Sequence, residues 1–245
     1  MASKKHLFAV LNFYETITPP PNYPTFTAGW KTLGRYVETL DHYVAAQLHR
    51  NLDEQGLFPY VNFSTFTGTT ERIIKDFMEP SLDLIKAVVE GHGMPGIQVN
   101  HPGGYEEIST LSGQQIIPDL PAKLGSTFII SAYRAPVSDN EFNNNIGDLE
   151  KDWLHWAGVE ALKVSVPSGV SICEAGLYKL FTPSEAFKAV TYTVRCEIIG
   201  LDAEDKTASL DLLSTIRNQE TPEKLELVDS SLYCLDEDCI SLRAK

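Results

Sequence analysis

Hydrophobic and polar positions follow two different periods in the first half of the chain, and these periods predict a series of strands and helices. Residues 6–15, HLFAVLNFYE, alternate with period two and are apolar on both faces, which predicts a strand covered on both sides. From Thr25 onward, apolar residues return every three or four positions through Trp30, which is typical of one face of a helix. The prolines between these segments predict a loop.

The next stretch predicts a hairpin, a helix and a fourth strand. Two β-rich runs, HYVAAQLHRNL and LFPYVNFSTF, are separated by the turn sequence DEQG. Residues 69–93 have helical spacing with a kink at Pro80, and residues 96–100, GIQVN, read as an extended piece before a glycine turn at 101–104. The order strand, helix, strand, strand, helix, strand is that of a ferredoxin-like domain.

The same order of elements recurs after residues 112–125, a stretch with scattered Pro and Gly and no sustained period. We therefore predict a first domain at 1–111, a linker at 112–125 and a second ferredoxin-like domain at 126–245. The repeat is one of pattern, without convincing residue identity between the halves. The expected strands of the second half are 126–135, 171–181, 189–201 and 225–235, and the expected helices are 143–162 and 207–219.

Composition narrows the classes of partner. The chain has 245 residues, 43% of them hydrophobic, and a net charge of -13, which disfavours nucleic acid because no basic cluster offsets the acidic excess. We expect a cytoplasmic protein, since the sequence has neither a membrane-length apolar run nor a secretory signal. The four cysteines do not resemble a disulfide framework and are expected to be free thiols: Cys173, Cys196, Cys234 and Cys239.

Short motifs in both halves resemble the dimeric α/β-barrel superfamily. The segment LHRNLDEQGLFPYVNFSTFTGTTE is similar to antibiotic biosynthesis monooxygenase domains, and DLEKDW, SVPSG and LYKLF are faintly similar to the EthD-like branch. The resemblance implies an α+β fold in which tandem ferredoxin-like repeats form a pseudo-dimeric barrel with a pocket inside. Two halves in one chain can cover each other's sheets, and relatives often associate further, so a homodimer of such chains is also possible.

Asn62 is the most prominent candidate for chemistry. Period two places it on one face of its strand with Tyr60 and Phe66, whereas Val61 and Phe63 share the other face. The second face is the better match to a helix-packing surface, so we expect Asn62 to point into the barrel. Family members that oxidise anthrones without a cofactor use an Asn at this position and a Trp four residues later, where this chain has Phe66. A structural amide bonded to nearby backbone or water is the alternative.

Other candidates would surround Asn62. His49 could serve as a general base, because the pKa of an unperturbed imidazole lies near neutrality, although a solvated His near the hairpin turn is the alternative. We expect Tyr14, Tyr60, Phe66 and Trp30 to bind the substrate, with plain core packing as the competing interpretation.

The sequence gives little support for a haem site, a metal site, a serine hydrolase site or a nucleotide-binding site. Haem-degrading relatives ligate iron with a His on the second helix, and no His occurs between Thr69 and Glu90. His92 and His101 flank a loop-like segment, but no carboxylate lies nearby at ligand spacing. The sequence has neither a G-x-S-x-G motif nor a phosphate-binding glycine loop.

The helix predicted in the second half carries aromatic residues that we interpret as structural. Helical geometry puts Trp153 and Trp156 close together and turns His155 away, so we expect two core tryptophans and an exposed His. The EthD-like pattern expects a His near Gly158, and this sequence has none, so we expect the second half to lack catalytic residues.

Together these features predict a cofactor-independent oxygenase, or a cyclase or isomerase, that acts on an aromatic, polyketide-like small molecule without a metal. Asn62 would orient a substrate oxygen, and His49 or a tyrosine would move a proton. The alternative from another class is a small-ligand-binding or stress-related α/β barrel without turnover.

Overall fold

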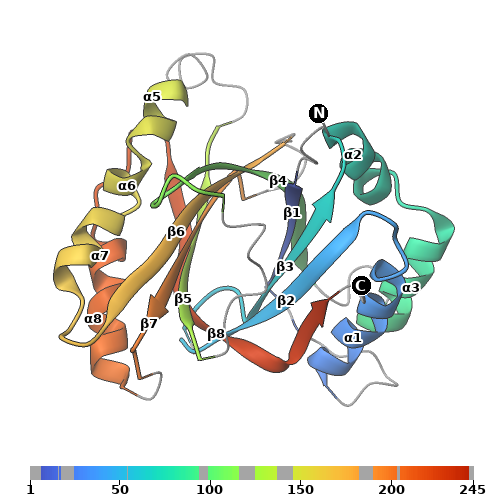
Figure 1. Ribbon diagram of the computed structural model, residues 1–245, viewed down its shortest axis with the longest axis horizontal. Helices are drawn as coiled ribbons and strands as arrows, with labels where there is room; N and C mark the ends of the chain where they lie inside the picture. Colours follow the sequence, from blue (N-terminus) through green and yellow to red (C-terminus); the bar gives the residue numbers. More distant parts are fainter. Residues whose placement is uncertain are drawn as a thin grey trace.

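The computed structural model shows an eight-stranded antiparallel barrel with helices outside it (Figure 1). It describes residues 7–15, 17, 25–53, 55–93, 99–115, 125–136, 146–181, 190–202 and 205–242. The strands are β1 (Leu7–Tyr14), β2 (Tyr43–Asn51), β3 (Tyr60–Thr67), β4 (Asn100–Thr110), β5 (Thr127–Arg134), β6 (Ser171–Leu180), β7 (Tyr192–Ile199) and β8 (Glu226–Leu242). The helices are α1 (Phe26–Val37), α2 (Thr70–Met78), α3 (Leu82–His92), α5 (Ile146–Lys151), α6 (Trp153–Trp156), α7 (Val159–Ser165) and α8 (Lys206–Arg217).

Each half of the chain contributes four neighbouring strands to the barrel. The order around it is β1-β3-β2-β8-β5-β7-β6-β4. Read within each half, this is β4-β1-β3-β2 followed by β8-β5-β7-β6, so both halves have the same strand order. The halves join where β2 pairs with β8 and where β4 pairs with β6. The expected α+β barrel is confirmed.

The helices lie on two opposite sides of the barrel. Figure 1 shows α1, α2 and α3 against the strands of the first half and α5 to α8 against those of the second half. Three buried clusters match this layering: one inside the barrel, one beneath α1 to α3 and one beneath α6 to α8. We call the cluster beneath α1 to α3 the first helix–sheet layer and the cluster beneath α6 to α8 the second helix–sheet layer.

Local sequence explains where the helices begin and end. The side chains of Thr25 and Asp205 accept hydrogen bonds from backbone N–H groups and cap α1 and α8. The predicted long helix at 69–93 is two helices, because Pro80 separates α2 from α3. The predicted helix at 143–162 is likewise divided, and Gly158, with a positive φ of 73°, lies between α6 and α7.

The predicted glycine turn at 101–104 is wrong, because these residues lie inside β4. The glycines serve close packing: a Cβ on Gly103 would lie 2.4 Å from Leu180 Cδ1, and one on Gly104 would lie 2.8 Å from the ring of Phe181. Most of the extended piece predicted at 96–100 and of the linker predicted at 112–125 lies outside the described residues. The domain boundaries therefore remain predictions.

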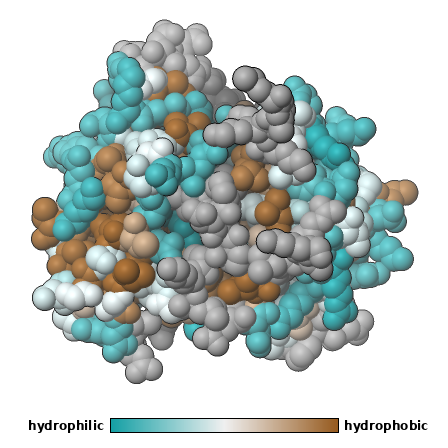
Figure 2. Space-filling view, in the orientation of Figure 1, coloured by the Kyte–Doolittle hydropathy of each residue, from teal (hydrophilic) through white to brown (hydrophobic). Residues whose placement is uncertain are grey.

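Some large apolar side chains are exposed on both halves. Figure 2 shows hydrophobic residues gathered over the side of the molecule that carries α7 and β7. Val164 and Ile199 belong to this side, and Leu82 on α3 is exposed in the first half. Within the described residues, no helix has both the length and the apolarity required to cross a membrane.

Candidate functional site

Asn62 lies on the outer face of the sheet, toward α1, and not inside the barrel. The Trp30 indole Nε1–H, on α1, donates to the Asn62 Oδ1 atom at 2.9 Å. The neighbours Val61 and Phe63 belong to the cluster inside the barrel. The prediction that Asn62 points inward is therefore wrong. The barrel interior is itself strongly apolar, so apolarity of a strand face did not identify the helix side.

A small polar group surrounds the Asn62 amide. Its Nδ2 atom donates to Ser64 Oγ at 2.9 Å, and Ser64 Oγ is 3.3 Å from Asn62 Oδ1. Asn12 on β1 is the register partner of Asn62, so two carboxamides lie side by side on this face. Both asparagines are half-buried.

Aromatic rings form the wall beside this polar group. Phe26 stacks on Tyr60 with ring centroids 4.5 Å apart and on His92 with centroids 5.4 Å apart. Tyr14 packs its ring edge-on against Phe26, and its hydroxyl lies 3.2 Å from His92 Nε2. Phe26 therefore stacks with both Tyr60 and His92, and the hydrogen-bonding groups of Tyr14 and His92 lie beside these rings.

Close packing of two helices positions His92. A Cβ on Gly91 would lie 2.6 Å from the Gly29 carbonyl oxygen, so the glycine allows α3 to approach α1. His92 follows directly at the end of α3 and is 3% exposed. Its spacing from the buried residues Leu84 and Ala87 was the sequence signal that could have placed it on the inner face of α3. From the sequence, His92 is predicted only as a weakly supported metal ligand beside His101.

Burial keeps both members of the Tyr14–His92 pair neutral. It lowers the pKa of His92 to about 4 and raises the pKa of Tyr14, an effect that the Asn12 side chain partly offsets. Within the described residues, the buried atoms His92 Nδ1 and Asn12 Oδ1 have no hydrogen-bond partner. These atoms are candidates to bond a ligand, because a buried polar group without a partner is costly.

His49 lies on the other side of the sheet from Asn62. It is fully buried inside the barrel against Phe128, with ring centroids 4.9 Å apart. The Val61 carbonyl, 3.2 Å from Nδ1, can only accept, so Nδ1 carries the proton and Nε2 accepts from the Gln47 amide at 3.3 Å. Burial, with the charge of Arg195, lowers its pKa well below the usual value. The expectation of a solvated His is wrong, and His49 does not face a ligand bound at Asn62.

The structure thus brings together Asn62, Trp30, Tyr14 and Tyr60 but places Phe66 elsewhere on the same face. Phe66 is completely buried beside Tyr43, so it packs in the core. An indole does contact Asn62, but it belongs to Trp30 on α1, whereas the position four residues after Asn62 is Phe66.

The prediction of two core tryptophans and an exposed His in the second half is confirmed. Trp153 and Trp156 are each 2% exposed, and the His155 side chain between them is 61% exposed. His101 pairs with Glu15, with Nε2 3.0 Å from the carboxylate.

Comparisons with known proteins identify a family and a shared fold. A family profile described as a domain of unknown function, DUF7153, matches residues 43–221. No curated protein matches the chain.

Solved structures similar to the chain include enzymes of one fold class. A candidate chlorite dismutase is 11% identical with a TM-score of 0.54, and 96% of each chain is covered. An anthrone oxidase-like protein is 14% identical with a TM-score of 0.51, covering 100% of this chain and 96% of that one. A chlorite dismutase variant from Candidatus Nitrospira defluvii is 10% identical with a TM-score of 0.50, covering 96% and 93%. At these identities the likeness shows the fold alone.

Proposed function

The chain belongs to the DUF7153 family, and we propose that it is an enzyme that oxidises, cyclises or isomerises an aromatic, polyketide-like small molecule without a metal or organic cofactor. The reaction would take place in the first helix–sheet layer, between β1, β3, α1 and α3. The observation that carries the proposal is the hydrogen bond from Trp30 to Asn62. It joins an amide and an indole in the combination used by the anthrone-oxidising relatives.

Asn62 is suited to hold a substrate oxygen. An amide nitrogen carries two hydrogens, and Ser64 accepts one of them. The second can donate to a ketone oxygen and stabilise the negative charge that develops when a proton leaves the neighbouring carbon. Trp30 fixes the amide orientation because its N–H can bond only to the Oδ1 side.

The Tyr14–His92 pair is suited to accept the proton. Burial keeps His92 neutral above pH about 4, and in the tautomer whose Nε2–H donates to the Tyr14 hydroxyl the lone pair of Nδ1 is free to accept a proton. In the oxygenase version, an anthrone CH2 group loses a proton to form the enolate, and O2 then converts that carbon to a carbonyl with release of water. His49 has no part in this scheme, because it lies inside the barrel.

Quinone formation from anthrone tests the proposal. We expect the purified protein to accelerate the rise in quinone absorbance, and Asn62→Ala to lower kcat/KM by about a hundredfold, the effect of losing one oxyanion donor. The matched control is His155→Ala, which alters an exposed residue of the second half. Equal rates for the wild type and Asn62→Ala would contradict the proposal.

A second candidate function is ligand binding without turnover. It is favoured by Phe66, which is completely buried and stands where the anthrone-oxidising family members have a Trp. Under this alternative, anthrone would quench the fluorescence of Trp30 while no quinone accumulates. Quinone formation that depends on Asn62 would eliminate it.

A further inference from the structure

Arg195 is a charged side chain buried inside the barrel, on the opposite side of the sheets from both helix–sheet layers. Its neighbours Val194 and Cys196 face the second layer, so Arg195 faces inward by the alternation of β7. It is 1% exposed. Its partners in register are Ile130 on β5 and Gly176 on β6, and the glycine has no side chain to compete with the guanidinium.

Two aromatic rings pack against the Arg195 guanidinium, but in the part of the chain that the structure describes its N–H groups have no hydrogen-bond acceptors. Arg195 Cζ lies 4.3 Å from the ring centroid of Phe128 and 5.7 Å from that of Phe63. Within the described residues, none of the Nε, Nη1 and Nη2 atoms has a hydrogen-bond partner. The Glu197 carboxylate is 3.9 Å from Nη1, too far for a hydrogen bond, and its other oxygen accepts from Ser126 at 2.7 Å. A buried guanidinium that donates to nothing strongly favours an additional acceptor.

Nearby carboxylates determine the charge of that acceptor. Burial lowers the pKa of Arg195, and Glu197 and Glu107 oppose this effect, so both carboxylates act on the guanidinium. Glu174 pairs with Glu197 in register, and all three glutamates are half-buried near the same end of the barrel. These carboxylates would repel an incoming anion, which favours a neutral acceptor.

We propose that Arg195 forms a second binding site, inside the barrel and separate from Asn62, for a small neutral molecule that presents a carbonyl oxygen to the guanidinium. The planar N–H groups match the in-plane lone pairs of a ketone or amide oxygen. The rings of Phe63 and Phe128 favour a flat, apolar body on that molecule. This site is independent of the function proposed for the first layer.

Benzamide and benzoate are a matched pair of probes, because they have the same shape and differ in charge. We expect benzamide to raise the melting temperature of the full-length protein in a concentration-dependent manner, and benzoate to bind about tenfold more weakly or worse. His155→Ala, which alters an exposed residue of the second half, should respond to benzamide like the wild type. Arg195→Met should lose the response, because methionine fills similar space without donors.

Arg195→Lys provides a second test if Arg195→Met does not fold. It keeps a positive charge but loses the planar fork, so we expect benzamide affinity to fall about tenfold, the loss of one charge-assisted hydrogen bond. Three results would overturn the proposal: no binding of benzamide to the wild type, equal binding to the Arg195 variants, or tighter binding of benzoate.

Discussion

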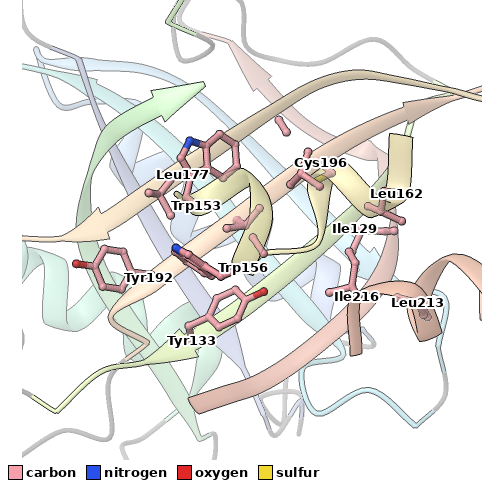
Figure 3. Close-up of a cluster of buried hydrophobic side chains, with 14 of the residues drawn as sticks. Ile129, Tyr133, Trp153, Trp156, Leu162, Leu177, Tyr192, Cys196, Leu213 and Ile216 are labelled. Carbon is pink, nitrogen blue, oxygen red and sulfur yellow. The ribbon is translucent and has the colours of Figure 1, made fainter. Parts of the chain in front are cut away.

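The two helix–sheet layers have the same strand order and different chemistry. In the first layer, two carboxamides and an imidazole lie among aromatic rings, and Asn12 Oδ1 and His92 Nδ1 have no partner within the described residues. The second layer is dominated by aliphatic and aromatic packing around Trp153 and Trp156 (Figure 3). Ser131 and Ser230 in that half bond each other at 2.8 Å.

This difference shows that a shared architecture need not carry a shared site. The second layer gains stability from apolar burial, whereas the first keeps polar groups that a packed core would exclude. Polar groups retained at such a cost are candidates for function. The following predictions test this division between a structural layer and a ligand-binding layer, beginning with the largest expected effect.

Removal of a core tryptophan should affect stability most. Trp153→Ala in the second layer deletes a side chain that is 2% exposed, and we expect the free energy of unfolding to fall by about 3–5 kcal/mol. His155→Ala is the matched control and should change it by less than about 0.5 kcal/mol. Urea denaturation measures both. A small effect of Trp153→Ala would mean that the second layer is not the tightly packed one.

Acid should selectively weaken the first layer. The folded pKa of His92, about 4, is below the unfolded value of about 6.5, so its contribution to stability is complete above pH 6.5 and is lost as pH falls toward 4. The loss amounts to about 3 kcal/mol. His92→Gln should remove this component from the pH dependence of unfolding, whereas His155→Gln should not. The same pH dependence in His92→Gln and the wild type would contradict this expectation.

The hydrogen bond from Trp30 to Asn62 should have a moderate effect. Trp30→Phe keeps a ring in place but removes the indole N–H, and Asn62→Ala leaves that N–H buried without its acceptor; we expect each to cost about 1–2 kcal/mol. A double-mutant cycle should give a coupling energy of about 1 kcal/mol. Additive effects would show that the contact does not stabilise the layer.

Removal of the helix N-caps should have the smallest effect on stability, and it compares α1 in the first half with α8 in the second half. Thr25→Ala and Asp205→Ala remove the N-caps of α1 and α8, and each should cost about 1 kcal/mol in thermal or urea unfolding. Only Thr25→Ala should also weaken ligand binding in the first layer, because α1 carries Trp30. Equal effects of both variants on binding would argue against a site confined to the first layer.

The sequence was sufficient to predict the barrel but not the side of the sheet on which Asn62 lies. Alternation on β3 correctly grouped Tyr60, Asn62 and Phe66, but it could not tell which face lies under helices, because both faces are buried. The face with Val61 and Phe63 was assigned to the helices for its apolarity, yet these residues fill the barrel. The alternation of residues along a strand identifies its two faces, but it does not show which face packs against helices and which faces the barrel interior.

Contacts between distant segments were beyond the reach of local patterns. The pairing of Trp30 with Asn62, and of Tyr14 with His92, depends on how α1 and α3 cross the sheet. The close approach of α3 to α1 at Gly29 and Gly91 brings His92, at the end of α3, toward the sheet. The prediction of a turn at 101–104 was wrong because Gly103 and Gly104 are needed for contacts with distant residues. Gly103 packs against Leu180 at the end of β6, and Gly104 packs against Phe181.

The long strand β8 has a consequence for biosynthesis. It pairs with β2 on one edge and with β5 on the other, so it seals one of the two junctions between the halves. A nascent chain can assemble the earlier strands but cannot complete the ring until β8 has left the ribosome. Until then β2 and β5 expose open edges, which makes the partly synthesised protein a potential client for chaperones that bind unpaired strands.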